Sequence, residues 1–289
     1  MNALTYATAQ LIRVLPRERI TRVMGKLSDI SWPQPVGRAV VDAYCRAYNV
    51  ELDECLKRDG FSSFDEFFTR ELQSGARPLP SDGGVVASPA DGRIESQGPV
   101  DGRRFWVKGR PYSVAELVGD EREAARYEGG AGCVVYLSPR DYHRVHAPVG
   151  GVIRSVRSMP GDYYPVNDIG VRHVPNLFAR NRRVAIALDA PEASGFGRVM
   201  VVMVAAMVVG RITVSCIASR DVPFGYHEMS PPRPVEQGEE IGIFRLGSTA
   251  VIFFEPGAVN RWEALEGPIR MGQPLARRTH KRGTDEGEG

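Results

Sequence analysis

The chain of 289 residues is 43% hydrophobic and 25% charged, which is typical of a globular protein with a sizeable core. Its longest apolar run, residues 199–209, is shorter than the roughly 18 residues that a membrane-spanning helix requires. The formal net charge of +2 is too small to favour nucleic acid as a partner. We therefore expect a folded protein without a membrane span and without nucleic-acid binding.

Positive charge is concentrated at the N-terminus, where residues 1–27 hold five basic residues and one acidic residue, a net charge of +4. Apolar residues recur at helical spacing in residues 4–15 and again in residues 20–27, on either side of Pro16. The pattern predicts two amphipathic helices, and because its apolar positions are periodic rather than continuous, it does not predict a cleavable signal peptide. Such helices either pack on the domain with a solvated basic face or lie on a membrane surface, and the pattern alone leaves both interpretations open.

Two further helices are predicted in the N-terminal quarter of the chain. Apolar spacing in residues 36–48 suggests a third helix, and Ser63 with Glu66 forms a capping box that begins a fourth helix, which we expect to run to Leu72. Residues 1–75 are therefore predicted to form a helical N-terminal region.

From Arg77 onward, short β-rich segments are separated by turn residues, without βαβ alternation and without an internal repeat. The pattern predicts an α+β protein whose core, residues 76–276, is predominantly antiparallel β and arranged as a sandwich or barrel. The polar, aperiodic residues 277–289 are predicted to form a disordered tail. The predicted strands are residues 85–88, 92–96, 104–107, 133–137, 152–158, 183–189, 199–209, 212–217 and 250–255.

The four cysteines lie far apart, with no CxxC pair and no histidine at zinc-finger spacing. This spacing predicts neither a metal site nor a disulfide framework. We expect reduced, mostly buried thiols at Cys45, Cys55, Cys133 and Cys216.

Three segments concentrate residues that can carry chemistry. Asp91 lies in the sequence Ser-Pro-Ala-Asp-Gly, where Asp-Gly by itself is an ordinary hairpin-turn signal. His143 and His146 lie in one polar loop, and the alternatives to a catalytic role are satisfied imidazoles or an incomplete metal site. Gly247 and Ser248 precede an apolar strand and fit a plain turn, but a glycine carbonyl is open to attack by the serine that follows it.

Asp91, His146 and Ser248 supply an acid, a base and a nucleophile, which is the set needed to activate a hydroxyl group. A serine hydrolase is one interpretation of this trio, since the order Asp, His, Ser also occurs in the subtilisin type. The chain has no G-x-S-x-G elbow, no G-x-G-x-x-G loop and no GxxxxGK[ST] loop. Conventional α/β-hydrolase and nucleotide-binding functions are therefore disfavoured.

Together these segments resemble the phosphatidylserine decarboxylases, a family of pyruvoyl-dependent, membrane-associated enzymes, and most closely the bacterial type. The matching stretches follow the order of the family and cover most of residues 60–275. The DYHRVH and LGST elements are long and specific. The full set is FDEFFTREL with ARPLP, SPADG, YLSPRDYHRVHAPVGG, PGDYYPVN, VPNLFARN and GEEIGIFRLGSTAVIFFEPG.

The resemblance implies that the chain cleaves itself between Gly247 and Ser248, leaving a large subunit of 247 residues and a small subunit of 42 as a heterodimer. His146, oriented by Asp91, removes the hydroxyl proton of Ser248, whose oxygen attacks the Gly247 carbonyl. Elimination and loss of ammonia then convert Ser248 into a pyruvoyl group, the covalent cofactor. A Schiff base of this group with phosphatidylserine releases carbon dioxide, His143 protonates the carbon, and the product is phosphatidylethanolamine.

A substrate in a bilayer also gives the N-terminal helices a purpose. The resemblance therefore favours their membrane-surface interpretation, and with it a peripheral protein that binds anionic lipid on the cytoplasmic face of the cell membrane. The sequence leaves acyl-chain preference and any further homo-oligomer open.

The chain departs from the family pattern at two positions. Arg182 stands where the family usually has glutamate, and Ala205 stands where glycine is common, at a position expected near the cleavage site. Neither change touches the implied catalytic residues, although both affect local packing. The remaining alternative, a lipid-binding protein of the same fold that no longer processes itself, is disfavoured by the intact LGST sequence, Asp91 and both histidines.

Overall fold

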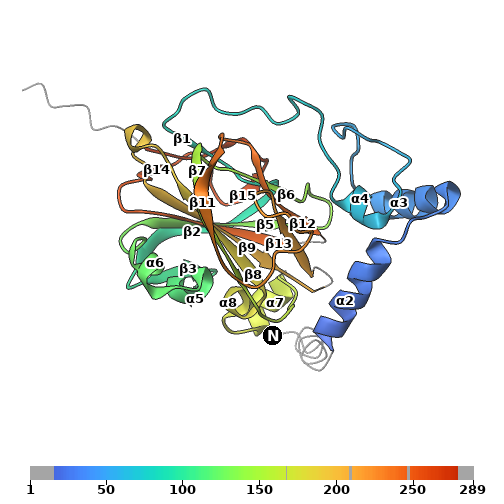
Figure 1. Cartoon of the computed structure of the whole chain (residues 1–289), viewed down its shortest axis with the longest axis horizontal. Helices are drawn as coiled ribbons and strands as arrows, with labels where there is room; N and C mark the ends of the chain where they lie inside the picture. Colours follow the sequence, from blue (N-terminus) through green and yellow to red (C-terminus); the bar gives the residue numbers. More distant parts are fainter. Residues whose placement is uncertain (1–15, 167, 208–209, 246–247, 279–289) are drawn as a thin grey trace, which may run out of the picture.

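The computed structural model describes residues 16–166, 168–207, 210–245 and 248–278, and a ten-stranded sheet lies at its centre (Figure 1). The strand order is β11-β7-β8-β9-β13-β5-β2-β3-β4, with β15 paired to β2, and neighbouring strands are antiparallel. The strands in chain order are β2 (Gly92–Asp101), β3 (Arg104–Val107), β4 (Arg110–Ser113), β5 (Ala131–Leu137), β7 (Gly151–Met159), β8 (Arg183–Asp189), β9 (Arg198–Ala205), β11 (Gly225–Val235), β13 (Ser248–Phe254) and β15 (Gly267–Ile269).

Two three-stranded antiparallel sheets complete the β structure. The first has the order β1-β16-β14 and the second has the order β10-β12-β6. The predicted α+β class with a mainly antiparallel β core is therefore confirmed. The bounds are β1 (Val85–Ala87), β16 (Pro274–Arg277), β14 (Arg261–Trp262), β10 (Arg211–Val214), β12 (Glu240–Arg245) and β6 (Arg144–His146).

Strands β9 and β13 are covered on both faces, which explains why their sequences are continuous apolar runs rather than alternating ones. Val251 and Phe253 of β13 belong to the hydrophobic cluster formed with the short helices α5 (Val114–Val118), α6 (Glu121–Ala125), α7 (Asp168–His173) and α8 (Leu177–Arg180). Ala250 belongs to the opposite cluster, which contains side chains of β6, β10 and β12. The centre of β13 is therefore fully buried on both faces of the sheet.

The N-terminal region contains less helix than the sequence predicts. Its described helices are α2 (Arg17–Ser28), α3 (Gln34–Tyr48) and α4 (Phe64–Phe68), while the predicted helix in residues 4–15 lies outside the described residues. The Ser63 hydroxyl caps α4 by accepting from the Glu66 N–H, as predicted, but the Glu66 carboxylate accepts from the Ser62 N–H rather than from Ser63.

The extension of this helix to Leu72 was wrong. α4 ends at Phe68, where the Thr69 hydroxyl donates to the Asp65 carbonyl and the Arg70 side chain turns toward the core. Leu72 instead forms an isolated bridge with Cys55, and segments 49–63 and 69–84 are largely non-helical.

Helix α2 presents its apolar stripe to the outside. Val23 and Leu27 are 54% and 48% exposed, and the buried residues of the helix are the polar Thr21 and Ser28. At its start, Arg17 forms two hydrogen bonds of 2.8 and 2.7 Å with the Asp162 carboxylate. Polar contacts therefore attach α2 to the body, and Figure 1 shows α2 and α3 projecting at its side. No helix in the described ranges is both long and apolar enough to cross a membrane.

The C-terminal segment is ordered slightly beyond the predicted boundary of the tail. Arg277 ends β16, and the Arg278 N–H donates to the Gly84 carbonyl. The rest of the predicted tail, residues 279–289, lies outside the described residues.

Candidate active site

The start of β13 lies between two neighbouring strands. The backbone of Ser248 is in register with Leu137 at the end of β5 and with Ala205 at the end of β9. Gly247 lies outside the described residues. The position of the Gly247–Ser248 bond is therefore known only from Ser248, the first residue of β13. The candidate cleavage bond thus precedes the first residue of β13, a central strand of the sheet.

The two histidines lie at the end of loop 138–143, the histidine loop, and in the strand β6 that follows it, which pairs with β12. Leu137 pairs with Ser248 at one end of this loop, and at the other end the His143 carbonyl accepts from the Phe244 N–H at 2.9 Å. The Asp141 carboxylate folds the loop by accepting from both the N–H and the hydroxyl of Ser138, each at 2.7 Å. Backbone pairing therefore brings the DYHRVH and LGST segments together.

The turn that carries Asp91 joins the same region. The His146 N–H donates to the Pro89 carbonyl at 2.8 Å, which places the turn against β6. A Cβ atom at Gly92 would lie 2.2 Å from the Tyr136 carbonyl oxygen, so only glycine permits this close approach to β5. The three segments singled out in the sequence thus converge, although Asp91 and Ser248 are 157 positions apart.

The Asp91 carboxylate is held by strong polar partners. It accepts from the Arg77 guanidinium at 3.0 and 2.6 Å and from the Met271 N–H at 2.7 Å. Asp91 and Arg77 are both buried, and these contacts raise the pKa of Arg77. The carboxylate is therefore held in place beside a permanent cation.

The hydrogen bonds of His146 define its tautomer. Nδ1 lies 2.8 Å from the Gly238 carbonyl oxygen, which can only accept, so Nδ1 carries the hydrogen. Nε2 lies 3.0 Å from the Tyr142 hydroxyl and accepts from it in the neutral ring. Burial lowers the pKa of His146, which favours this neutral form. In this structure the ring of His146 is oriented by the Gly238 carbonyl and the Tyr142 hydroxyl. The Asp91 carboxylate, which was expected to orient it, is bound by Arg77 and the Met271 N–H instead.

His143 is a buried neutral imidazole with one nitrogen unused. Its Nδ1 donates to the Asp141 carbonyl at 2.8 Å, and its ring packs on Phe68 with a centroid distance of 4.1 Å. Burial, together with the nearby Arg70, lowers the pKa of His143 to about 3. Nε2 has no hydrogen-bond partner among the described residues, and the same is true of the buried Thr249 hydroxyl beside Ser248. The site therefore holds two buried polar atoms without a partner, and each is costly to bury unless a further group binds it.

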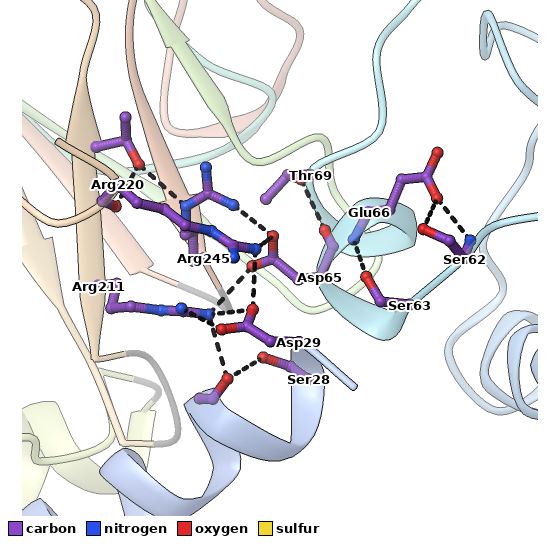
Figure 2. A network of polar contacts seen from close by, with 12 residues as sticks. Ser28, Asp29, Ser62, Ser63, Asp65, Glu66, Thr69, Arg211, Arg220 and Arg245 are labelled. Carbon is purple, nitrogen blue, oxygen red and sulfur yellow. Dashed lines mark hydrogen bonds and ion pairs between the residues drawn. The ribbon is translucent and has the colours of Figure 1, made fainter. Parts of the chain in front are cut away.

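A cluster of ion pairs holds the chain just before the candidate cleavage site (Figure 2). Arg245, the last residue of β12, forms an ion pair with the buried Asp65 of α4. Arg220 bridges Asp65 and Asp29 at 2.7 and 2.9 Å, and Arg211 makes a two-pronged contact with Asp29 at 2.6 and 2.8 Å. The end of α2, the start of α4 and the end of β12 are thus tied together.

The two departures from the family pattern have clear structural settings. Ala205 is the register partner of Ser248, which confirms that this position lies near the candidate cleavage site. The buried Arg182 forms an ion pair with Asp221 at 2.6 Å and donates to the Val222 carbonyl at 3.0 Å. The cation at position 182 is therefore compensated within the fold.

Sequence reasoning missed several residues that build the site. Arg77, Tyr142 and Asp141 lie inside the motifs ARPLP and SPRDYH, so the sequence marked their segments but not their roles. Arg77 holds the Asp91 carboxylate only because the fold brings together these two residues, which are 14 positions apart in the sequence.

Comparisons with known proteins agree with the motifs. A family model described as phosphatidylserine decarboxylase matches residues 64–277. The chain is 41% identical to a phosphatidylserine decarboxylase proenzyme of Anaeromyxobacter sp. (strain K), over 91% of this chain and 95% of that protein. It is 40% identical to the proenzyme of Bordetella avium, over 90% and 91% of the two chains, and 38% identical to that of Myxococcus xanthus, over 95% and 99%.

The buried neutral state of His143 predicts a pH-dependent stability. The folded pKa of about 3 lies below the ordinary value of 6.5, so between these pH values the unfolded chain binds a proton that the folded chain does not. Stability should therefore fall as the pH drops from 6.5 toward 3, with on the order of 2 kcal/mol lost by pH 5 from this residue alone. Urea unfolding at pH 7 and pH 5 measures this loss in the free energy of unfolding. His143→Gln should lose about 2 kcal/mol less between these pH values than the unsubstituted protein.

His227→Gln is the control, because His227 is partly exposed whereas His143 is buried. This variant should keep the pH dependence of the unsubstituted protein. An equal loss of stability in the unsubstituted protein and in His143→Gln would contradict the assignment of a neutral His143.

Proposed function

The chain belongs to the phosphatidylserine decarboxylase family and is an enzyme of that activity, and we propose that it acts only after cleaving itself between Gly247 and Ser248. The observation that carries this proposal is that two segments distant in the sequence, the Asp91 turn and the histidine loop, pack near the start of β13, where Ser248 lies. No comparison favours a serine hydrolase or an unprocessed lipid-binding protein.

In the proposed self-cleavage, His146 is the base. Its hydrogen is fixed on Nδ1 by the Gly238 carbonyl, so its lone pair is on Nε2, and the Tyr142 hydroxyl that donates to Nε2 would have to give way to the hydroxyl of Ser248. His146 takes the hydroxyl proton of Ser248, and the oxygen attacks the Gly247 carbonyl to replace the amide by an ester. Elimination then releases the Gly247 carboxylate and leaves dehydroalanine at position 248, and hydrolysis by one water with loss of ammonia converts that residue into the ketone.

The converted residue is the proposed pyruvoyl cofactor, and it supplies an electrophilic ketone that takes up the electrons left by departing carbon dioxide. The residues present fit such a group. The unpartnered Nε2 of His143 offers an acceptor, and the unpartnered hydroxyl of Thr249, the residue after 248, offers a donor.

The proposed role of His143 is to protonate the substrate carbon, since replacing a carboxylate by hydrogen consumes one proton. In the described state, His143 is neutral and cannot donate from Nε2. We propose that the anionic substrate raises its pKa on binding, because a nearby negative charge favours the imidazolium form. The acid would then be charged only when substrate is present.

The two cleavage products are proposed to remain together as a heterodimer. The small product begins with β13, which lies between β9 and β5 and is paired with both along its whole length. Its side chains are buried in the hydrophobic clusters on both faces of the sheet. Separation would break two backbone ladders and expose this core.

We further propose that α2 and α3 rest on the cytoplasmic surface of the cell membrane. Val23, Met24 and Leu27 of α2 and Val36 and Val40 of α3 are exposed apolar residues. Exposed basic residues, Arg19, Arg22 and Lys26, accompany them on α2. An exposed apolar face bordered by cations is typical of helices that lie on anionic lipid.

Self-cleavage predicts two fragments, the smaller of which has a blocked N-terminus. Ser248→Ala should remain a single chain because the attacking hydroxyl is gone, whereas Ser158→Ala, which changes a buried serine of β7, should split normally. Intact-mass measurement of the purified proteins distinguishes these outcomes. Splitting of Ser248→Ala at the same bond would refute the proposed nucleophile.

The two histidines should fail at different stages when substituted. His146→Ala should stay uncleaved or cleave much more slowly, because it loses the base. His143→Ala should split normally but form phosphatidylethanolamine roughly a hundredfold more slowly, because it loses a positioned acid. Gel analysis and a product assay separate the two steps, and a His143→Ala protein that never splits would assign this residue to maturation.

Membrane association should depend on the exposed face of α2. Replacing both Val23 and Leu27 by glutamate should reduce binding to phosphatidylglycerol-containing vesicles at least tenfold, because it removes apolar contacts and adds like charge. Leu265→Glu is the matched control, since Leu265 is 80% exposed but lies outside the helices. Vesicle sedimentation measures the effect, and unchanged binding of the double variant would exclude α2 as the contact.

A further inference from the structure

A cavity of about 450 Å³ lies beside the candidate active site. Its walls come from the segment between α3 and β1, from Asp91 and Gly92, from the loop that holds Tyr142, and from residues 268–273. The volume lies in the range of small-molecule sites. Asp91 and Tyr142, which both contact the machinery described above, form part of its wall.

Arg70 lines this cavity as a buried cation without a carboxylate partner. Its side chain is 6% exposed and donates to two backbone carbonyls, those of Arg140 at 2.8 Å and Asp141 at 3.2 Å. Its other neighbours, the ring of Phe67 and the thiol of Cys55, are uncharged. Its Nε atom has no hydrogen-bond partner, and within the described ranges Arg70 forms no ion pair. A buried and uncompensated charge is costly unless an anion binds to it.

The acidic groups of the cavity do not compensate Arg70. Asp91 and Glu54 are paired with Arg77, and Arg270 also contacts Glu54. The Asp141 carboxylate is occupied by Ser138. The remaining acid of the wall, Glu51, is exposed to solvent.

Arg70 is also close to the proposed acid of the reaction. The carbonyl oxygen of Asp141 accepts from both the Arg70 guanidinium and Nδ1 of His143. An anion held by the free edge of Arg70 therefore lies within one or two side-chain lengths of the imidazole.

We propose that Arg70 binds the phosphodiester of the phosphatidylserine headgroup in this cavity. This inference rests on the proposed function, since it names the residue that recognises the phosphate of that substrate. In phosphatidylserine, only the β-carbon and the ester oxygen separate the phosphorus from the reacting α-carbon. A phosphate bound at Arg70 is therefore compatible with reaction beside His143.

The carboxylate of the substrate is the less suitable anion for Arg70. Its negative charge moves away as carbon dioxide forms, so a cation bound to it would stabilise the ground state more than the transition state and would slow the reaction. The phosphodiester keeps its charge throughout, so Arg70 can bind it equally in both states. Arg70 should therefore affect KM more than kcat.

The test compares Arg70→Met, Arg70→Lys and the unsubstituted enzyme in detergent micelles that contain phosphatidylserine. Arg70→Met should raise KM at least tenfold with kcat within about threefold, and Arg70→Lys should recover part of the loss because it keeps the charge. Arg233→Met, at a half-exposed arginine of β11, should leave both constants unchanged. The extent of self-cleavage of each variant is measured first, since normal cleavage shows that the histidine loop is intact.

A second measurement uses non-reacting competitors. Glycerophosphocholine carries the phosphodiester without a primary amine or carboxylate, and it should compete with phosphatidylserine in the unsubstituted enzyme but at least tenfold more weakly in Arg70→Met. Inorganic phosphate tests whether the site binds free phosphate rather than the phosphodiester of a lipid headgroup. Competition by inorganic phosphate together with no competition by glycerophosphocholine would assign the site to free phosphate and overturn the proposal.

The remaining outcomes are equally decisive. An unchanged KM in a normally cleaved Arg70→Met enzyme would overturn the headgroup site while leaving the proposed function intact. If Arg70→Met does not cleave, Arg70→Gln decides, because glutamine keeps hydrogen-bond donors but removes the charge, and an unchanged KM and unchanged competition in that variant would exclude phosphate recognition by Arg70. Failure of the unsubstituted chain to cleave or to release carbon dioxide would instead reject the proposed function itself.

Discussion

The pairing of β13 along both of its edges is the constraint on which the site depends. Residues 248–254 are in register with β5 on one side and with β9 on the other, and the faces of the strand are buried in separate clusters. A strand held in this way cannot shift by one residue without exchanging its two buried faces. The position of Ser248 is therefore set by the whole core, and the histidine loop and the Asp91 turn are built against that fixed point.

Hydrogen bonding to backbone carbonyls gives the two imidazoles their character. Gly238 and Asp141 each accept from the Nδ1 atom of a histidine, and burial keeps both rings neutral. The Asp91 carboxylate, which would favour a charged ring, is instead engaged by Arg77. The fold thus presents two neutral imidazoles with defined tautomers and engages the Asp91 carboxylate elsewhere.

The attachment of α2 reverses the usual arrangement of an amphipathic helix. Ion pairs at its two ends, Arg17 with Asp162 and Asp29 with Arg211, hold it to the body, while its apolar stripe faces outward. Exposed apolar area costs about 25 cal/mol per Å² in water, and a lipid surface would remove that cost. Because Asp29 also shares Arg220 with Asp65, which holds Arg245, the same ion pairs connect this helix to the chain before the candidate cleavage site.

The sequence by itself determined the mainly antiparallel core, because apolar runs and turn residues report burial and chain reversal locally. β3 and β8 were predicted at their observed bounds. The sequence pattern did not predict β11, because its prolines disfavour a strand. β11 lies at the edge of the sheet, where prolines are tolerated. The motifs marked Asp91, His143, His146 and the Gly247–Ser248 bond as candidates.

Only the tertiary structure decided what surrounds these residues. The partners of Asp91 and His146, the unused nitrogen of His143, the uncompensated charge of Arg70 and the outward face of α2 all arise from contacts between distant parts of the chain. Periodicity and motif spacing describe neighbours along the sequence. Hydrogen-bond partners, burial and local charge depend on neighbours in space, which strand pairing and core packing select.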